Sequence, residues 1–417
     1  MTLPLDPAQA LAAFPDRPGA YLHVPFCEQL CPFCPYDKVR WQADRVAPYF
    51  AALHRELDLW LPHLQAPFRS LYVGGGTPTC CLDELEPVLA RLPVEGERAI
   101  ELLPTHASPE RVERLRELGI GAVSVGVQSF DDAVLHHLGR PMCAADNLRA
   151  LDAVAGRFDC VDVDLIFDVA FAAPEVLLRD LETCFARGVD QVSTYPLMRF
   201  AYTPFGAAPH AAAQEHALLH RAEELAERHG YRRAAVWTFV RPGGPRYSSI
   251  TRELFLGLGA SAASFSGRRF WVNHFSPERY AEPLAQGALP VARQIELPGP
   301  LGPLYWMFWQ AYAGRVDLRR LEPLFGTSRA VQAVAAGLVD IGWATREEGG
   351  QTITLSPRGR DVYHDLEREV TTHLIEPLWA DLMAEHDPAD HPPPTPRGGP
   401  VAWVGRRARR RWAWFPG

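Results

Sequence analysis

Residues 21–39 read YLHVPFCEQLCPFCPYDKV, and this stretch decides how the rest of the chain is interpreted. It places Cys27, Cys31 and Cys34 in a C-x3-C-x2-C array within one short loop. Three closely spaced cysteines can hold a four-iron cluster and leave one iron without a protein ligand. Such an iron can bind and reduce a small molecule, whereas a cluster with four cysteine ligands can only pass electrons. The array therefore predicts a reactive iron–sulfur site.

Two other interpretations of the array are weaker. A zinc ion needs a fourth ligand, and the nearest candidate, His23, lies on the predicted strand before the loop. Disulfides are less favoured still, because we expect no secretory signal and the remaining cysteines are scattered as buried thiols would be. Those remaining cysteines are Cys80, Cys81, Cys143, Cys160 and Cys184.

The composition sets outer limits on size and location. A chain of 417 residues with 47% hydrophobic content can bury a large core, and about two domains are expected. No apolar run approaches the roughly twenty residues that a membrane span requires. The formal net charge of -8 gives no general basic field, which makes nucleic acid an unlikely main partner. We therefore expect a cytoplasmic protein that does not bind membranes.

Lys38 is the only lysine among the 42 basic residues. Elsewhere the chain uses arginine, so a lysine four residues after Cys34 suggests a position where a guanidinium does not fit. Chance survival of a single lysine is the alternative interpretation.

Between residues 20 and 195 the chain alternates strands with helices about six times. Strands are expected at residues 20–24, 70–73, 99–103, 122–128, 161–167 and 191–195, with helices at 47–60, 82–92, 109–118, 131–138, 144–154 and 174–186. This order predicts a parallel sheet with right-handed crossovers, and six units are too few for a closed eight-stranded barrel. We predict an α/β fold with an open, partial (β/α)6 barrel.

The segments outside the repeat divide the chain further. Residues 1–18 are a short lead-in, 19–208 the barrel, 209–385 a second domain and 386–417 a basic tail expected to be disordered. The second domain is predicted to contain a helix at 210–229, a strand at 234–239 and, around residues 353–360, a small winged-helix unit. Because its arginines alternate with acids, we favour a lid or packing role for that unit over DNA reading.

Polar residues gather where the predicted strands end. Gly74, Gly75 and Gly76 follow one strand and permit close approach of the backbone to a small ligand. Glu101 and Asp164 end two other apolar strands at the same rim, where ribose hydroxyls or an ammonium group are natural partners. Salt bridges to arginines such as Arg140 are the alternative for each carboxylate.

These residues together carry a family resemblance. The chain resembles the radical S-adenosylmethionine (SAM) enzymes, and among them the oxygen-independent coproporphyrinogen III oxidases and their HemN-like relatives. The matching motifs are YLHVPFCEQLCPFC, YVGGGTPT, ELLP at 101–104, SVGVQSF at 124–130, LGR at 138–140, DLIF at 164–167 and GLGASAAS at 257–264. They occur in the family's order over residues 20–380. The resemblance implies a partial TIM-like barrel followed by an α+β C-terminal HemN-type domain.

The resemblance also implies roles for individual positions. Cys27, Cys31 and Cys34 would ligate a [4Fe-4S] cluster whose open iron chelates SAM. Tyr21, Gly75 and Glu101 match positions that hold this first SAM. Positions that hold a second SAM in the coproporphyrinogen enzyme are matched by Phe33, Gly76, Thr77, Gln128, Arg140, Asp164, Pro196 and Ala263. Electron transfer into the sulfonium would give methionine and a 5′-deoxyadenosyl radical, which abstracts hydrogen inside a shielded barrel.

Departures from the family pattern limit the substrate. Tyr36 stands where the coproporphyrinogen enzyme has a further cysteine, Pro35 replaces a glycine, and Asp168 replaces a glycine after DLIF. Most of the N-terminal extension that closes over the porphyrinogen in that enzyme is also missing. Tyr36 and Lys38 border the expected substrate space and are the candidate catalytic residues.

Three functions follow from these expectations. The first is a two-SAM radical enzyme that methylates or cyclopropanates a small planar metabolite and takes electrons from a flavodoxin or ferredoxin. The second is oxidative decarboxylation of a tetrapyrrole. The third is a haem-binding chaperone, for which no histidine stands out as an axial ligand, although His136 and His137 form an exposed-looking pair.

Overall fold

A computed structural model describes residues 5–169, 172–206, 212–244 and 253–386. Its core is one 12-stranded sheet in the order β14-β13-β12-β11-β1-β4-β5-β6-β7-β8-β10-β9. The six central strands from β1 to β8 run parallel to their neighbours. They are β1 (Gly19–Val24), β4 (Leu71–Gly75), β5 (Arg98–Leu102), β6 (Ala122–Gln128), β7 (Cys160–Phe167) and β8 (Gln191–Pro196). The predicted partial (β/α)6 barrel is confirmed.

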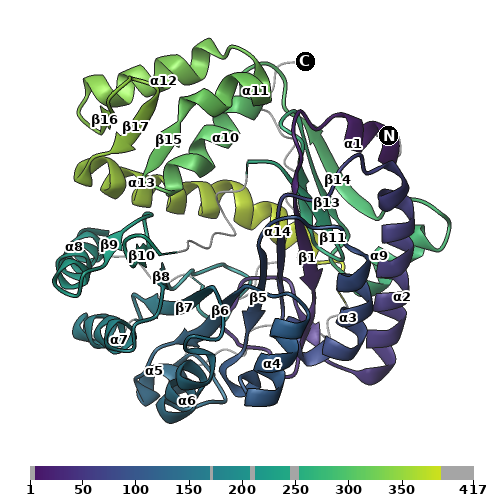
Figure 1. Ribbon diagram of the computed structural model, residues 1–417, viewed down its shortest axis with the longest axis horizontal. Helices are drawn as coiled ribbons and strands as arrows, with labels where there is room; N and C mark the ends of the chain where they lie inside the picture. Colours follow the sequence, from purple (N-terminus) through teal and green to yellow (C-terminus); the bar gives the residue numbers. More distant parts are fainter. Residues whose placement is uncertain (1–4, 170–171, 207–211, 245–252, 387–417) are drawn as a thin grey trace, which may run out of the picture.

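Helices that precede, connect or follow these strands cover the outer face of the sheet (Figure 1). They are α1 (Pro7–Ala12), α2 (Ala43–Trp60), α3 (Leu82–Arg91), α4 (Pro109–Glu117), α5 (Asp132–His137), α6 (Ala144–Val154), α7 (Glu175–Ala186) and α8 (Ala212–Arg228). In α2 the buried residues Val46, Phe50, Leu53 and Leu57 recur every three or four positions. This spacing gives one apolar stripe, which packs on the sheet.

Later strands extend the barrel sheet at both edges. The strand β11 (Phe255–Leu258) adds in parallel to β1, and β12 (Ala263–Phe265), β13 (Arg269–Asn273) and β14 (Val291–Glu296) follow in antiparallel order. Helix α9 (Pro277–Leu284) lies against α2. At the other edge, β10 (Thr238–Val240) pairs antiparallel with β8 and with β9 (Arg232–Arg233).

The single strand predicted at residues 234–239 is therefore wrong. A turn separates β9 from β10, and the Arg233 side chain stabilises it by donating to the Val236 carbonyl oxygen at 2.5 and 2.9 Å. The Trp237 carbonyl oxygen accepts from the Thr194 backbone N–H at 2.7 Å, which fixes the turn to β8.

A small domain follows the sheet. It contains α10 (Leu301–Tyr312), α11 (Leu321–Phe325), α12 (Arg329–Asp340), α13 (Pro357–Val370) and the three-stranded sheet β15 (Arg315–Asp317), β17 (Thr352–Leu355) and β16 (Ala344–Arg346). A π-helical turn, Thr371–Ile375, leads from α13 into α14 (Glu376–Met383). In Figure 1, α13 runs between this domain and the barrel, and α14 lies over the strand ends.

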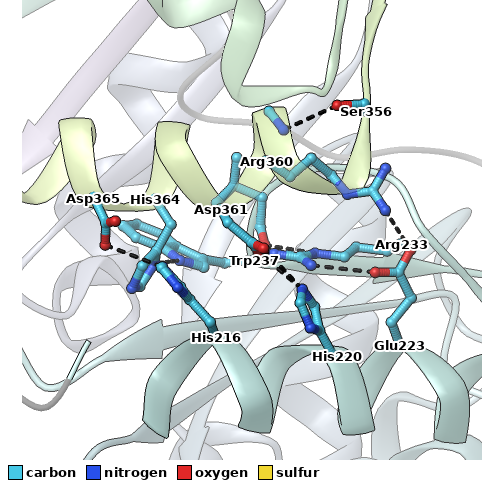
Figure 2. A network of polar contacts seen from close by, with 12 residues as sticks. His216, His220, Glu223, Arg233, Trp237, Ser356, Arg360, Asp361, His364 and Asp365 are labelled. Atoms are coloured by element: carbon cyan, nitrogen blue, oxygen red, sulfur yellow. Dashed lines mark hydrogen bonds and ion pairs between the residues drawn. The ribbon is translucent and has the colours of Figure 1, made fainter. Parts of the chain in front are cut away.

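A polar network joins α8 of the barrel to α13 (Figure 2). The His216 Nε2 atom lies 3.1 Å from the Asp365 carboxylate, and His220 Nε2 lies 3.0 Å from Asp361. One helical turn further on, Glu223 accepts from both Arg233 and Arg360. These pairs fix the angle at which the small domain meets the barrel.

Atoms of His216, His364 and Asp365 in this network lie within 4.8 Å of one another, a spacing that could suit a metal ion. However, both ring nitrogens of the buried His364 are engaged. Trp237 Nε1 donates to its Nδ1 at 2.8 Å, and its Nε2 lies 2.8 Å from Glu215. An imidazole whose two ring nitrogens are both hydrogen-bonded has no free lone pair for a metal ion. We therefore interpret the network as a structural contact between α8 and α13.

Two expectations stay predictions. The domain divisions at residues 18, 208 and 385 are not tested, although β9 to β14 continue the barrel sheet. The basic tail expected at 386–417 lies outside the described residues, apart from His386. Among the described residues, no helix combines the length and apolar character of a membrane span.

Candidate functional site

The cysteine loop leaves β1 and is closed at its base by a short parallel pair. β2 (Phe26–Cys27) pairs with β3 (Val39–Arg40), so residues 28–38 form a closed loop at the carboxyl end of the sheet. Inside it, Lys38 is almost fully buried, and its Nζ donates to the carbonyl oxygens of Cys34 at 2.7 Å and Tyr36 at 3.2 Å. Lys38 thus fixes the backbone after the third cysteine.

The three thiols of the loop share one environment. Thr77 Oγ1 donates to the Cys27 sulfur at 3.4 Å, and an Arg140 N–H donates to the Cys31 sulfur at 3.4 Å. Burial raises the pKa of Cys27 to about 12 and also raises the pKa of Cys34, with the neighbouring thiols adding to both increases. Buried thiols with donors aimed at sulfur suit metal ligation, because the metal supplies the positive charge that thiolates need. The donor set therefore fits an iron–sulfur cluster.

The other cysteines lie apart from this group. Cys80 and Cys81 contact each other at 3.4 Å on the turn after β4, and Cys160 and Cys184 are buried on β7 and α7. Cys143 is exposed at the N-terminus of α6, so the expectation of a buried thiol is wrong there. All eight cysteines are free thiols.

The glycines at the end of β4 are needed to pack against the cysteine loop. Gly75 has φ +119°, and a Cβ there would lie 2.8 Å from the Val24 carbonyl oxygen. A Cβ on Gly76 would lie 2.6 Å from the Phe26 carbonyl oxygen. The next residue, Thr77, donates its backbone N–H to the same oxygen at 2.7 Å. Any side chain at Gly75 or Gly76 would push the loop away from the sheet.

Glu101 ends β5 beside these glycines. Its carboxylate accepts from the Tyr72 hydroxyl at 2.5 Å and from the Gly75 backbone N–H at 3.1 Å. The Tyr72 ring stacks on Tyr21, with ring centroids 5.8 Å apart. Burial, together with the nearby Asp164, raises the pKa of Glu101 to about 8. A donor-rich or cationic ligand would favour its ionised form.

Asp164 occupies the matching place on β7. The Ser124 hydroxyl donates to it at 2.5 Å, and burial raises its pKa to about 6, although Arg140 opposes this increase. Arg140 also donates to the Gly126 carbonyl oxygen at 2.6 Å, so one guanidinium contacts both β6 and the Cys31 sulfur. Arg140 therefore binds the cysteine loop and β6 in addition to its electrostatic effect on Asp164. Gln128 ends β6 with φ +71°, a strained backbone for a non-glycine residue.

Three predicted positions lie at the edge of this group. Phe33 packs in a small apolar cluster with Val134 and Leu138. Pro196 ends β8 opposite Phe167 of β7. Ala263 begins β12 and packs in a different apolar cluster. The carboxylates, Arg140, the glycines and the thiols therefore lie together, whereas Pro196 and Ala263 mark the flanks.

The sequence did not point to a buried chain of polar groups beneath the loop. Tyr21 Oη lies 2.8 Å from His23 Nδ1, and His23 Nε2 lies 3.2 Å from the Asp37 carbonyl oxygen. The Asp37 carboxylate in turn lies 2.5 Å from His386 Nε2, at the C-terminal end of the described chain. Burial lowers the pKa of His23. Only the tertiary fold brings residues 349 positions apart together.

Comparison with known proteins extends these observations. Residues 21–170 match the model of the radical SAM superfamily. The chain is 32% identical over 381 residues to the haem chaperone HemW of Mycobacterium tuberculosis, covering 84% of this chain and 94% of that protein. It is 28% identical over 324 residues to the oxygen-independent coproporphyrinogen III oxidase of Cereibacter sphaeroides, covering 68% and 70%.

The fold has a solved counterpart. The structure of coproporphyrinogen III oxidase HemN from Escherichia coli aligns with a TM-score of 0.71 at 22% identity, over 86% of this chain and 91% of that one. This likeness supports the fold, and the superfamily match implies a [4Fe-4S] cluster and SAM as cofactors. With its three-cysteine loop and its full-length relatives, the chain belongs to the HemN-like family of radical S-adenosylmethionine proteins.

Proposed function

We propose that the protein is a radical SAM enzyme that oxidatively decarboxylates a tetrapyrrole of the coproporphyrinogen type. The joint placement of three thiols and two buried carboxylates at one rim of the sheet supports the radical SAM chemistry. The relative named oxygen-independent coproporphyrinogen III oxidase supports the tetrapyrrole substrate. A rim built this way suits a cofactor that brings both metal-ligating groups and hydroxyl or cationic groups.

The residues of the rim take separate roles in this proposal. Cys27, Cys31 and Cys34 hold the cluster, which when bound supplies the electron that cleaves SAM. Glu101, held in place by Tyr72 and the Gly75 N–H, binds the first SAM. Lys38 supports the loop backbone and does not act on substrate.

A second SAM in the same rim is also part of the proposal. Asp164 of β7 accepts from Ser124 of β6, and Arg140 donates to the Gly126 carbonyl oxygen of β6. Arg140 spans from the Cys31 sulfur to β6, so a ligand bound to it would lie against the cluster. As the partner that supplies electrons, we propose a small redox protein such as a flavodoxin or ferredoxin.

Methyl transfer or cyclopropanation, our first expectation from the sequence, is not the main proposal. The relatives described above are named as coproporphyrinogen oxidases and haem chaperones. A tetrapyrrole substrate therefore has more support than a small planar metabolite.

A haem-chaperone role is the second candidate. The relative matched over 94% of its length carries that name. The two candidates differ in whether the tetrapyrrole is changed, since a chaperone binds haem without altering it.

The test is anaerobic turnover of the reconstituted, reduced protein with coproporphyrinogen III and SAM. Decarboxylation predicts carbon dioxide and 5′-deoxyadenosine in proportion. Haem binding without carbon dioxide release would favour the chaperone, and S-adenosylhomocysteine together with a methylated product would favour methyl transfer. 5′-Deoxyadenosine formation without tetrapyrrole binding or turnover would overturn the proposal.

A further inference from the structure

Four aromatic side chains from three distant segments meet beside the cysteine loop, and we name them the aromatic wall: Tyr36, Phe200, Tyr202 and Trp379. Tyr36 follows Cys34 by two residues, Phe200 and Tyr202 follow β8, and Trp379 lies on α14. The Tyr36 and Trp379 ring centroids are 5.7 Å apart.

Several contacts hold the aromatic wall rigidly in place. Phe200 stacks on Trp379 with centroids 6.0 Å apart and an interplanar angle of 10°. The Tyr202 hydroxyl donates to the Pro35 carbonyl oxygen at 3.0 Å, which ties the segment after β8 to the cysteine loop. In addition, Glu376 at the start of α14 accepts from the Ala201 backbone N–H. Rings fixed in this way can bind a ligand with little loss of conformational entropy.

One ring of the wall is left open. Tyr36 is 55% exposed, whereas Phe200 is buried. Tyr36 follows the thiol of Cys34 by two residues and packs on Trp379 at one side. Its exposed ring therefore lies beside the loop that carries the three thiols.

The backbone beside Trp379 is unusual. The π-helical turn Thr371–Ile375 separates α13 from α14. Short π-helical insertions in helices are frequent at functional sites, since they redirect the side chains that follow. Here the turn is followed by Trp379, which packs with Leu378 and Met383 against Phe275 and reaches Tyr36 at its other side.

We propose that Tyr36 and Trp379 form a substrate platform that stacks against a pyrrole ring of the tetrapyrrole and sets which carbon atom faces the radical. This inference rests on the proposed function. A pyrrole offers a π face to an aromatic ring, and each such contact is worth about 0.5–1.5 kcal/mol beyond the buried area. The platform is a binding surface and takes no part in SAM cleavage.

The test uses the full chain with its cluster reconstituted and coproporphyrin III as a fluorescent, unreactive probe. Tyr36→Leu and Trp379→Leu should each weaken binding about threefold to tenfold, whereas Tyr36→Phe keeps the ring and should stay within about twofold. Turnover with coproporphyrinogen III should also become uncoupled, with more 5′-deoxyadenosine formed per carbon dioxide. Trp41→Leu is the matched control, since Trp41 is 40% exposed and lies just after β3, at the base of the loop.

The outcomes separate the two proposals. If the wild-type protein turns over coproporphyrinogen III and both leucine variants show unchanged binding and coupling, the platform proposal fails and the proposed function stands. If the wild-type protein neither binds coproporphyrin III nor releases carbon dioxide, the proposed function fails and the platform assignment fails with it. Because Tyr36 is exposed, Tyr36→Leu remains informative even if Trp379→Leu does not fold.

Discussion

Glu367 gives a stability prediction that depends on pH. It lies on the face of α13 that packs inward, is 6% exposed, and accepts a hydrogen bond from the Thr371 hydroxyl at 2.9 Å. Burial raises its pKa from 4.5 to about 7, partly offset by Thr371 and Arg368. Folding therefore favours the protonated carboxyl group.

The sign and size follow from proton linkage. Between pH 4.5 and 7 the folded chain binds more protons at Glu367 than the unfolded chain does, so stability falls as pH rises through this window and then levels off. The full difference is about 3 kcal/mol, most of which falls between pH 5 and pH 8. For a chain of this length that amounts to about 3 °C in melting temperature.

The assay compares the melting temperatures of wild type and Glu367→Gln at pH 5 and pH 8 under anaerobic conditions. The amide cannot ionise, so the variant should gain about 3 °C relative to wild type on going from pH 5 to pH 8. Glu369→Gln is the control, because Glu369 and its partner His373 are each 70% exposed. Equal pH dependence in wild type and Glu367→Gln would refute the burial argument.

Three further predictions concern the loop. Replacing any one of the loop cysteines (Cys27→Ala, Cys31→Ala or Cys34→Ala) should abolish the brown chromophore and SAM cleavage, whereas Cys160→Ala should retain both. Iron content measures the cluster, and 5′-deoxyadenosine formation measures SAM cleavage. Lys38→Met leaves the Cys34 and Tyr36 carbonyl oxygens without their donor and should make cluster loss to a chelator severalfold faster. Lys38→Arg should not restore the slow loss rate of the wild type, because a planar guanidinium replaces a compact ammonium. Equal loss rates in wild type and variants would contradict this role of Lys38. Asp37→Asn removes the charged partner of His386 and should raise the rates of hydrogen exchange and proteolysis in α14. Unchanged rates would show that the Asp37–His386 contact does not hold α14 in place.

The barrel could be predicted because its signals are local. Strand β6 and helix α6 begin and end at the predicted residues, since runs such as AVSVGVQ and the helical spacing of Ala150, Leu151 and Val154 each specify one element. The strand expected at 234–239 failed because a side-chain contact from Arg233 stabilises a turn that hydrophobicity does not reveal. The added edge strands β11 to β14 also depend on tertiary pairing.

The motifs of the site could be predicted from the sequence, but the residues that hydrogen-bond to the motif residues could not. Sequence spacing located the cysteines, the glycines, Glu101 and Asp164, all of which lie at one sheet edge. It missed Tyr72, which donates to Glu101, and His386, which contacts Asp37. Such partners are recruited by three-dimensional proximity, and a single sequence carries no periodic or spacing signal for them.

The contacts of the C-terminal segment explain where specificity can arise. The sheet edge supplies the thiols and carboxylates, to which we assign the cofactors in the proposed function. The segment from α13 onward reaches the same place by three independent contacts: Trp379 with Tyr36, Glu376 with Ala201, and His386 with Asp37. Each of these contacts ends on the cysteine loop or on the segment after β8, so a change in α14 or at His386 would alter the wall of the site. If the proposed function holds, we expect substrate choice to vary through residues 376–386 while the cysteines stay the same.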